Sequence, residues 1–290
     1  MKSESKKIAW LMLLGQLFFQ LTVIIVVAVS VFIGKADQGM LIGADVGSFL
    51  ANVIILGIYY LAKRNKNISL PVKRRHSLLI VPAALFSILI WNLIIGACDF
   101  ALESVLNHPA DPTDNVSPLF RFIAIAVLPA LFEEFAFRKV IFGSMRKYGV
   151  AVAAVFSSIL FGLMHQDITQ GIFAFGMGLI LCYVYEKTGK LIYTVLLHFL
   201  NNSISVLLPL IPEYNANGRL IEAILGIIAL ALVIVIFLIP RLRILMLNKL
   251  RVNCNQVKSA SKDCYLNVPL VIYIVFCIGM TVVTFVVKYG

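Results

Sequence analysis

The sequence predicts an all-α protein, a polytopic bundle of transmembrane helices. Of its 290 residues, 61% are hydrophobic and only 13% are charged, whereas an ordinary soluble protein carries about 25% charged residues. The apolar residues form long continuous runs, and about 20 such residues suffice for a helix to cross a bilayer. A membrane β-barrel would show alternating apolar and polar residues instead. We therefore expect residues 1–290 to form a single integral membrane domain.

About nine apolar runs have the length and composition of membrane-spanning helices. The first is longer than the roughly 7–15-residue core of a cleavable signal peptide, so we expect it to be retained as an anchor. The stretch that follows the third run, up to the fourth, is rich in prolines and acids and is typical of an exposed loop. The expected spans are 8–33, 41–62, 77–99, 119–143, 149–166, 168–186, 190–210, 220–239 and 268–287.

The positive charges predict an orientation for these nine spans. The chain has 25 Lys and Arg against 14 Asp and Glu, a formal net charge of +11. With the N-terminus in the cytoplasm and the C-terminus outside, only Lys35, Arg121, Arg219 and Lys288 fall on the outer side. This asymmetry is the one that the positive-inside rule describes. The basic residues are spread over every inside loop, so they do not indicate a nucleic-acid-binding face.

Two adjacent glutamates, Glu133 and Glu134, lie within the fourth expected span. Even lenient scales give an unfavourable insertion free energy of about 2.5–3.5 kcal/mol for one charged residue at the centre of a membrane helix. Arg138 follows Glu134 by four residues, so both share a helical face and can pair. Glu133 points about 100° away around the helix and must face another neighbour. A purely structural explanation is that Glu133 bonds to another span and the pair fixes helix packing.

Two other spans carry the histidines that we expect inside the membrane. Phe161 and His165 lie four residues apart at the end of the fifth span, and His198 and Asn202 have the same spacing in the seventh. Each histidine alone is explained by a hydrogen bond between helices. Together with the glutamates, these side chains can activate a water molecule and stabilise an oxyanion. Glu133, His165 and His198 could equally hold zinc. Both routes lead to hydrolysis.

The motifs resemble those of the CPBP intramembrane proteases, which include the type II CAAX prenyl endopeptidases and the Abi or bacteriocin-immunity proteins. The family pattern is EExxxR, then FxxxH, then HxxxN or HxxxD, on separate spans. All three are complete in this sequence, within a catalytic-motif core at about residues 119–208. They are Glu133 and Glu134 with Arg138, Phe161 with His165, and His198 with Asn202.

The resemblance implies an intramembrane endopeptidase that cuts a membrane-associated protein or peptide. By position, Glu133 and His165 would orient and deprotonate the attacking water, while His198 and Asn202 would stabilise the oxyanion. The family is often labelled as metalloproteases. The sequence lacks a complete ligand shell, so a zinc-dependent mechanism and a metal-free glutamate mechanism both remain open.

The resemblance also assigns supporting roles to the other motif residues. Glu134 and Arg138 would fix the carboxylates, in agreement with their spacing, and Phe161 would be structural or line the site. One feature fits poorly: Glu133 falls near the middle of the membrane, but His165 falls near the outer end of its span. The assignment of His165 requires that this helix be tilted, start deeper in the membrane or break near Gly162.

Two other functions agree with the composition. An ion-coupled transporter would explain buried carboxylates, but it predicts matching repeats with broken helices, and the sequence shows no repeat. A non-catalytic immunity or scaffold protein would keep the fold and bind a peptide partner. Short loops and the lack of appended domains favour a bacterial cell membrane, where such a protease would serve peptide maturation, export or self-protection against a bacteriocin.

Overall fold

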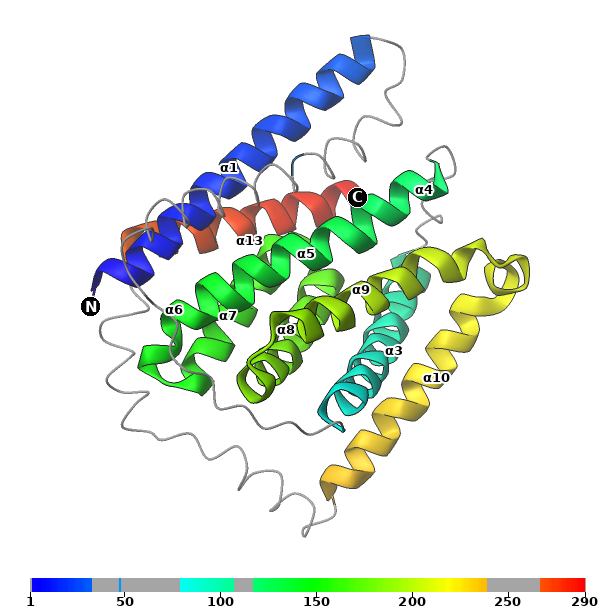
Figure 1. Cartoon of the computed structure of the whole chain (residues 1–290). Helices are drawn as coiled ribbons and strands as arrows, with labels where there is room; N and C mark the ends of the chain where they lie inside the picture. Colours follow the sequence, from blue (N-terminus) through cyan, green and yellow to red (C-terminus); the bar gives the residue numbers. More distant parts are fainter. Residues whose placement is uncertain (1, 33–46, 48–78, 107–116, 239–266, 290) are drawn as a thin grey trace.

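The computed structural model describes residues 2–32, 47, 79–106, 117–238 and 267–289, and within these ranges every regular element is a helix (Figure 1). Six of the described helices are long and apolar enough to cross a membrane. The expected span at 41–62 lies outside the described residues apart from Gly47. The all-α class and the multi-pass membrane character are therefore confirmed, while the count of nine and the orientation stay predictions.

A continuous helical rod carries the glutamate motif, as expected for the span at 119–143. It runs through α4 (Pro118–Arg121), η2 (Phe122–Val127), α5 (Leu128–Glu134), η3 (Phe135–Phe142) and α6 (Gly143–Met145), and ends in the 3-10 turn η4 (Arg146–Tyr148). The stretches η2 and η3 are π-helical, with backbone bonds that skip one residue more than in an α-helix. They flank α5, so the wider turns lie on both sides of the two glutamates.

Helices α7 (Val150–Met164) and α8 (Ile168–Thr188) form a tight antiparallel hairpin beside this rod. Gly162 and Gly171 allow their backbones to touch, because a Cβ on Gly162 would lie only 2.6 Å from the Gly171 carbonyl oxygen. Such small-residue contacts are typical of membrane helices. Gln166 turns the chain with a left-handed φ of 54°. The carboxylate of Asp167 then caps α8 by accepting the Gln170 N–H at 2.8 Å.

The remaining helices surround this centre. α9 (Leu191–Leu207), extended by the 3-10 turn η5 (Leu208–Leu210), packs on the rod and on α8, whereas α10 (Pro212–Leu238) packs on α3 (Ile80–Leu106). α1 (Lys2–Phe32) and α13 (Val268–Tyr289) lie side by side at the opposite edge (Figure 1). Large apolar side chains remain exposed along these outer helices, as expected for surfaces that face lipid.

One boundary differs from the sequence-based expectation. α3 continues to Leu106, so the beginning of the expected exposed loop is helical. Its acids Asp99 and Glu103 lie one turn apart and both face Arg219 of α10, which lies 3.9 Å from Asp99 and forms an ion pair with Glu103. Asp99 and Glu103, two of the acids that suggested a loop, have a basic partner on another helix that is far away in the sequence.

Candidate active site

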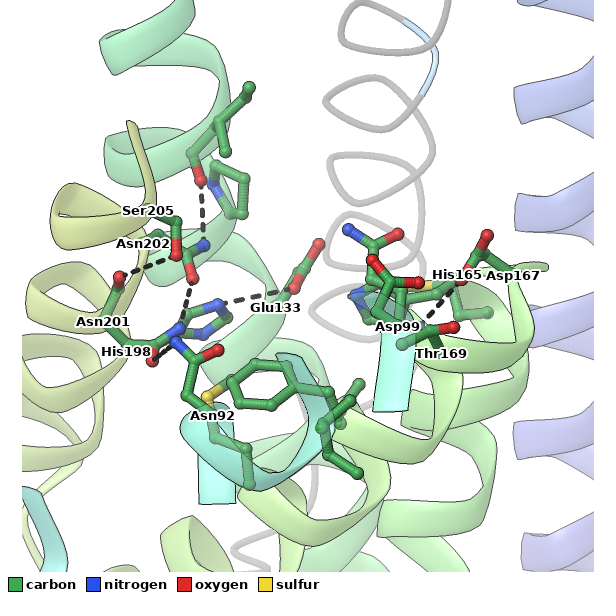
Figure 2. Close-up of a pocket in the computed structure, with 18 of the residues that line it drawn as sticks. Asn92, Asp99, Glu133, His165, Asp167, Thr169, His198, Asn201, Asn202 and Ser205 are labelled. Carbon is green, nitrogen blue, oxygen red and sulfur yellow. Dashed lines mark hydrogen bonds and ion pairs between the residues drawn. The ribbon is translucent and has the colours of Figure 1, made fainter. Parts of the chain in front are cut away.

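A cavity of about 760 Å³ lies between α1, α3, the rod, the α7–α8 hairpin, α9 and the end of α13. Glu133, His165, His198 and Asn202, the four residues expected to be catalytic, all line it. Figure 2 shows Glu133 between two polar groups of side chains, one around His198 on α9 and one around His165 at the turn. The rod, the α7–α8 turn and α9 are far apart in the sequence, yet they bring these four residues to one cavity.

Behind this cavity, Glu134 and Arg138 form a fully buried ion pair. Both side chains have 0% exposure, and Nε of Arg138 lies 3.1 Å from Oε2 of Glu134. In the part of the chain that the structure describes, neither atom has a hydrogen-bond partner, so the contact is an ion pair without hydrogen-bond geometry. The guanidinium also lies over the Phe161 ring, 4.6 Å from its centroid. The pairing expected from the i, i+4 spacing is present, and a cation–π contact adds to it.

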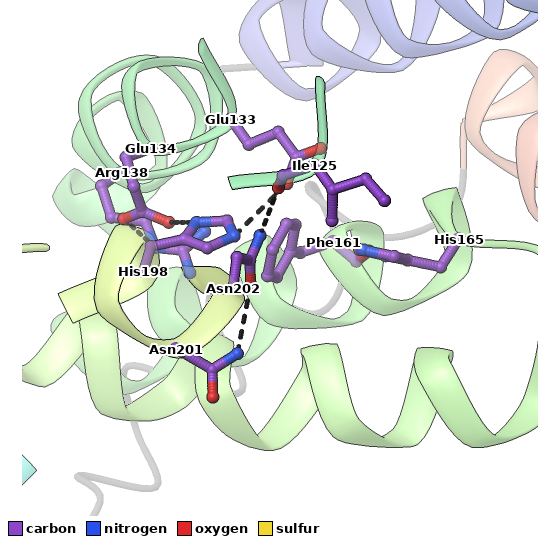
Figure 3. Close-up of polar contacts among 9 residues, drawn as sticks. All are labelled: Ile125, Glu133, Glu134, Arg138, Phe161, His165, His198, Asn201 and Asn202. Atoms are coloured by element: carbon purple, nitrogen blue, oxygen red, sulfur yellow. Dashed lines mark hydrogen bonds and ion pairs between the residues drawn. The ribbon is translucent and has the colours of Figure 1, made fainter. Parts of the chain in front are cut away.

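The imidazole of His198 lies between the two glutamates. Its Nδ1 is 3.0 Å from Oε1 of Glu134, a hydrogen bond that the ring N–H donates to the carboxylate. Its Nε2 is 3.9 Å from Oε2 of Glu133. Glu134 thus fixes the orientation of the ring and turns Nε2 toward Glu133 (Figure 3). Sequence spacing within one helix did not indicate this bond between α5 and α9.

Glu133 differs from Glu134 in its surroundings. It is 5% exposed and lines the cavity, and its distance of 3.9 Å from His198 is longer than a hydrogen bond. A gap of this size lets one water molecule approach both atoms at hydrogen-bond distance. The expectation that Glu133 faces a neighbour other than Arg138 agrees with this geometry.

His165 reaches the cavity from the end of α7. Its ring Nδ1 bonds to the Phe161 carbonyl oxygen at 2.8 Å, so the N–H lies on Nδ1 and Nε2 keeps a free lone pair. The rings of His165 and His198 both pack edge-on against Phe161, at centroid distances of 5.1 and 6.0 Å (Figure 3). α7 is unbroken at Gly162 and has only 15 residues. This short helix ends beside the cavity, which brings His165 to its wall.

Three asparagine amides form a directed chain of hydrogen bonds along the cavity wall. Asn92 of α3 donates to Asn201 at 3.3 Å, Asn201 donates to Asn202 at 3.1 Å, and Asn202 donates to the Ile125 carbonyl at 2.9 Å. Ile125 lies in the π-helical stretch η2, and Pro129, four residues later, has no N–H to donate to its carbonyl. The Asn202 amide gives this carbonyl a donor, and its hydrogen bonds to Asn201 and Ile125 hold it in one orientation.

The sequence analysis did not identify Asn92 and Asn201 as site residues. Asn201 has a weak signal, since it forms a doublet with Asn202, but Asn92 belongs to no motif. Both line the cavity. Their role depends on the packing of α3 against α9, which sequence spacing does not reveal.

The predicted zinc ligands do not form a ready ligand set. Among the described residues, no three His, Cys, Asp or Glu side chains are grouped closely enough to hold one metal ion. Nδ1 of His198 is bonded to Glu134, and the rings of His165 and His198 each pack against Phe161.

Comparison with known proteins finds relatives of the motif region. Residues 115–204 match the model of the Rce1-like type II CAAX prenyl endopeptidases. The chain is 35% identical over 104 residues to the membrane-embedded CAAX protease MroQ of Staphylococcus aureus strain USA300. This alignment covers 33% of this chain and 42% of MroQ. The chain is 31% identical over 99 residues to YdiL of Bacillus subtilis strain 168, over 34% of this chain and 40% of YdiL.

The chain thus aligns with about two-fifths of the length of these curated relatives. No solved structure matches it. The shared region contains the rod, the α7–α8 hairpin and most of α9, which carry all three motifs. α1, α3 and α13, which also line the cavity, lie outside the segment that matches the family model.

Proposed function

We propose that this chain, whose residues 115–204 belong to the Rce1-like type II CAAX prenyl endopeptidase family, is an intramembrane endopeptidase. It would hydrolyse a peptide bond in a membrane-associated protein or peptide. The observation that carries this proposal is the division of the glutamate pair. Glu134 is neutralised by Arg138 and bonded to His198, whereas Glu133 faces the cavity without a hydrogen bond to the His198 ring.

Glu133 is the proposed general base. A water molecule near its carboxylate would lose a proton to Glu133 while its oxygen attacks the carbonyl carbon of the substrate. The resulting tetrahedral intermediate would collapse as the C–N bond breaks, and the proton held by Glu133 would pass to the leaving amine. His165 is proposed to orient this water, because its Nε2 lone pair is free to accept a hydrogen bond.

His198 and Asn202 are the proposed donors to the oxyanion. A charge balance supports this role: with His198 protonated, the carboxylates of Glu133 and Glu134 are matched by Arg138 and the imidazolium. The Asn202 amide uses one N–H for the Ile125 carbonyl and has a second N–H to offer. Oxyanion donors act best when they are fixed before the reaction, and both side chains here are held by other residues.

The proposal is tested by comparing membrane-bound and secreted peptides from cells that carry the wild type or Glu133→Gln. Both proteins must be equally abundant in the membrane. We expect at least one peptide to lose its wild-type end in the Glu133→Gln cells. Identical peptide ends under several growth conditions, or full biological activity of the variant, would favour the non-catalytic immunity or scaffold function instead.

A second measurement separates the metal-free and zinc mechanisms. With the peptide identified above and the purified protein, the metal-free mechanism predicts that the cleavage rate is unchanged by 1,10-phenanthroline. Loss of cleavage that added zinc restores would instead show that the enzyme uses the metal. In a bacterial membrane, either mechanism would suit peptide maturation or self-protection against a bacteriocin.

A further inference from the structure

α1 forms one wall of the cavity, although it lies outside the segment that matches the family model. Met12, Gly15, Gln16 and Phe19 line the cavity from this helix. Their spacing of i, i+3, i+4 and i+7 places them on one helical face. Gln16 is the polar member of this set.

The amide of Gln16 is buried but its nitrogen is unpaired. The residue is 5% exposed, and among the described residues Nε2 has no hydrogen-bond partner. A buried donor without a partner is unfavourable, and nearly all such groups in folded proteins are paired. Because Gln16 lines the cavity, a rotation of its side chain can bring this donor to an acceptor on a molecule bound there.

A second glutamine fixes the position of α1 relative to the catalytic turn. Gln20, one helical turn after Gln16, donates its Nε2 hydrogen to Oε1 of Gln166 at 2.8 Å. Gln166 directly follows His165 and has the left-handed φ of 54°. The bond therefore joins α1 to the turn that carries His165, and Gln16 is held in register with the proposed active site.

The charges of the cavity indicate which acceptor suits Gln16. Within the ranges that the structure describes, its charged lining consists of Asp99, Glu133, Asp167 and Lys288. Asp99 faces Arg219 at 3.9 Å and Asp167 faces Lys288 at 3.8 Å, so these charges already have partners. A neutral amide donor matches a neutral carbonyl oxygen, which every residue of a peptide substrate carries.

We propose that Gln16 is a substrate-binding residue whose Nε2 donates a hydrogen bond to a backbone carbonyl of the bound peptide. The substrate would then lie between α1 and the α7–α8 turn, with its scissile bond at Glu133. This inference rests on the proposed peptidase function. It adds a contact that aligns the substrate and does not take part in the bond-breaking step.

The inference is tested with Gln16→Met, which keeps the length of the side chain and removes the amide. The probe is a synthetic peptide that spans the cleavage site found by comparing wild-type and Glu133→Gln cells. We expect KM to rise about three- to tenfold, the loss of one neutral hydrogen bond, with little change in kcat. The Tm in detergent should stay the same or rise, because a buried unpaired donor is removed.

Two controls separate binding from packing. Gln20→Met removes the bond to Gln166 and should lower both kcat and Tm. Leu17→Met changes a lipid-facing residue that is 48% exposed and should alter neither KM nor Tm. An unchanged KM for Gln16→Met would overturn the inference, since Gln16 would then bond only to water in the cavity. A fall in Tm as large as that of Gln20→Met would also overturn it.

The result also distinguishes the two proposals. If Glu133→Gln abolishes cleavage and Gln16→Met leaves KM unchanged, only the role of Gln16 is wrong. If Glu133→Gln leaves every peptide end unchanged, the peptidase function is wrong and the role of Gln16 falls with it.

Discussion

The two nitrogens of the His198 ring face two different regions of the molecule. Nδ1 faces the buried cluster of Glu134 and Arg138, where both charged side chains have 0% exposure and balance each other. Nε2 faces Glu133 and the cavity, where the nearest carboxylate oxygen is 3.9 Å away. Adjacent glutamates thus have opposite surroundings. The buried cluster holds the imidazole in place, and the cavity has a carboxylate that is available for chemistry.

The largest effect on the buried cluster should come from Arg138→Met. Removing the cation leaves Glu134 as an unbalanced buried charge, which typically costs about 3–5 kcal/mol. The contact with the Phe161 ring is lost as well. Thermal unfolding in detergent measures this effect. The matched control is Arg219→Met, since Arg219 is 50% exposed in its ion pair with Glu103, and exposed pairs contribute about 1 kcal/mol or less. Equal losses of Tm in the two variants would show that the buried Glu134–Arg138 pair matters no more for stability than an exposed ion pair.

A smaller effect is expected from Gly162→Ala, which disturbs the cavity through helix packing. The new Cβ would lie 2.6 Å from the Gly171 carbonyl oxygen, so α7 and α8 must move apart. Overpacking of this kind costs about 1–3 kcal/mol. Displacement of the His165 turn should lower kcat/KM by about tenfold or more, because a shift of about 1 Å at an active site can cost a hundredfold.

The control for this substitution is Gly279→Ala on α13. A Cβ at Gly279 would have no heavy atom within 4 Å, so its Tm should be unchanged or slightly raised by the better helix propensity of alanine. The packing argument fails if Gly162→Ala and Gly279→Ala have the same Tm and the same kcat/KM.

The smallest effect is expected from Asn92→Leu, at the far end of the amide chain. Asn92 acts only through Asn201 on the orientation of Asn202. We expect kcat to fall about three- to tenfold, well below the roughly hundredfold or greater loss when an oxyanion donor itself is removed. KM should stay unchanged. Steady-state kinetics would show this split. Ser87→Ala should change neither constant, because the Ser87 hydroxyl donates to the Ala83 carbonyl of its own helix and Ser87 is not among the cavity-lining residues that the structure describes.

If Asn92→Leu instead raised KM and left kcat unchanged, Asn92 would contact the substrate directly. The amide chain would then belong to the binding surface, and it would not position Asn202.

Local spacing in the sequence predicted much of this site. The i, i+4 positions of Glu134 and Arg138 lie on one helical face, and the structure pairs them. The same spacing set Phe161 beside His165, whose rings are in contact. Long apolar runs predicted the helical bundle, since only internally bonded backbones are tolerated in lipid.

Other features depend on packing between helices and had no local signal. The bond of His198 to Glu134 joins residues 64 positions apart, and the chain from Asn92 to Asn202 needs α3 to contact α9. The unpaired amide of Gln16 is evident only once α1 lines the cavity. The π-helical turns of the rod were not predicted either, because a run that is apolar on most of its faces carries no signal for a change in backbone pairing.

The most direct test of the division between Glu133 and Glu134 is to compare Glu133→Gln and Glu134→Gln for substrate cleavage and Tm. We predict that Glu133→Gln melts like the wild type but cleaves at least about a hundredfold more slowly, the usual loss for a general base. Glu134→Gln should lower the Tm, because Arg138 loses its counter-charge. Wild-type cleavage by Glu133→Gln, or a loss of Tm equal to that of Glu134→Gln, would contradict this account.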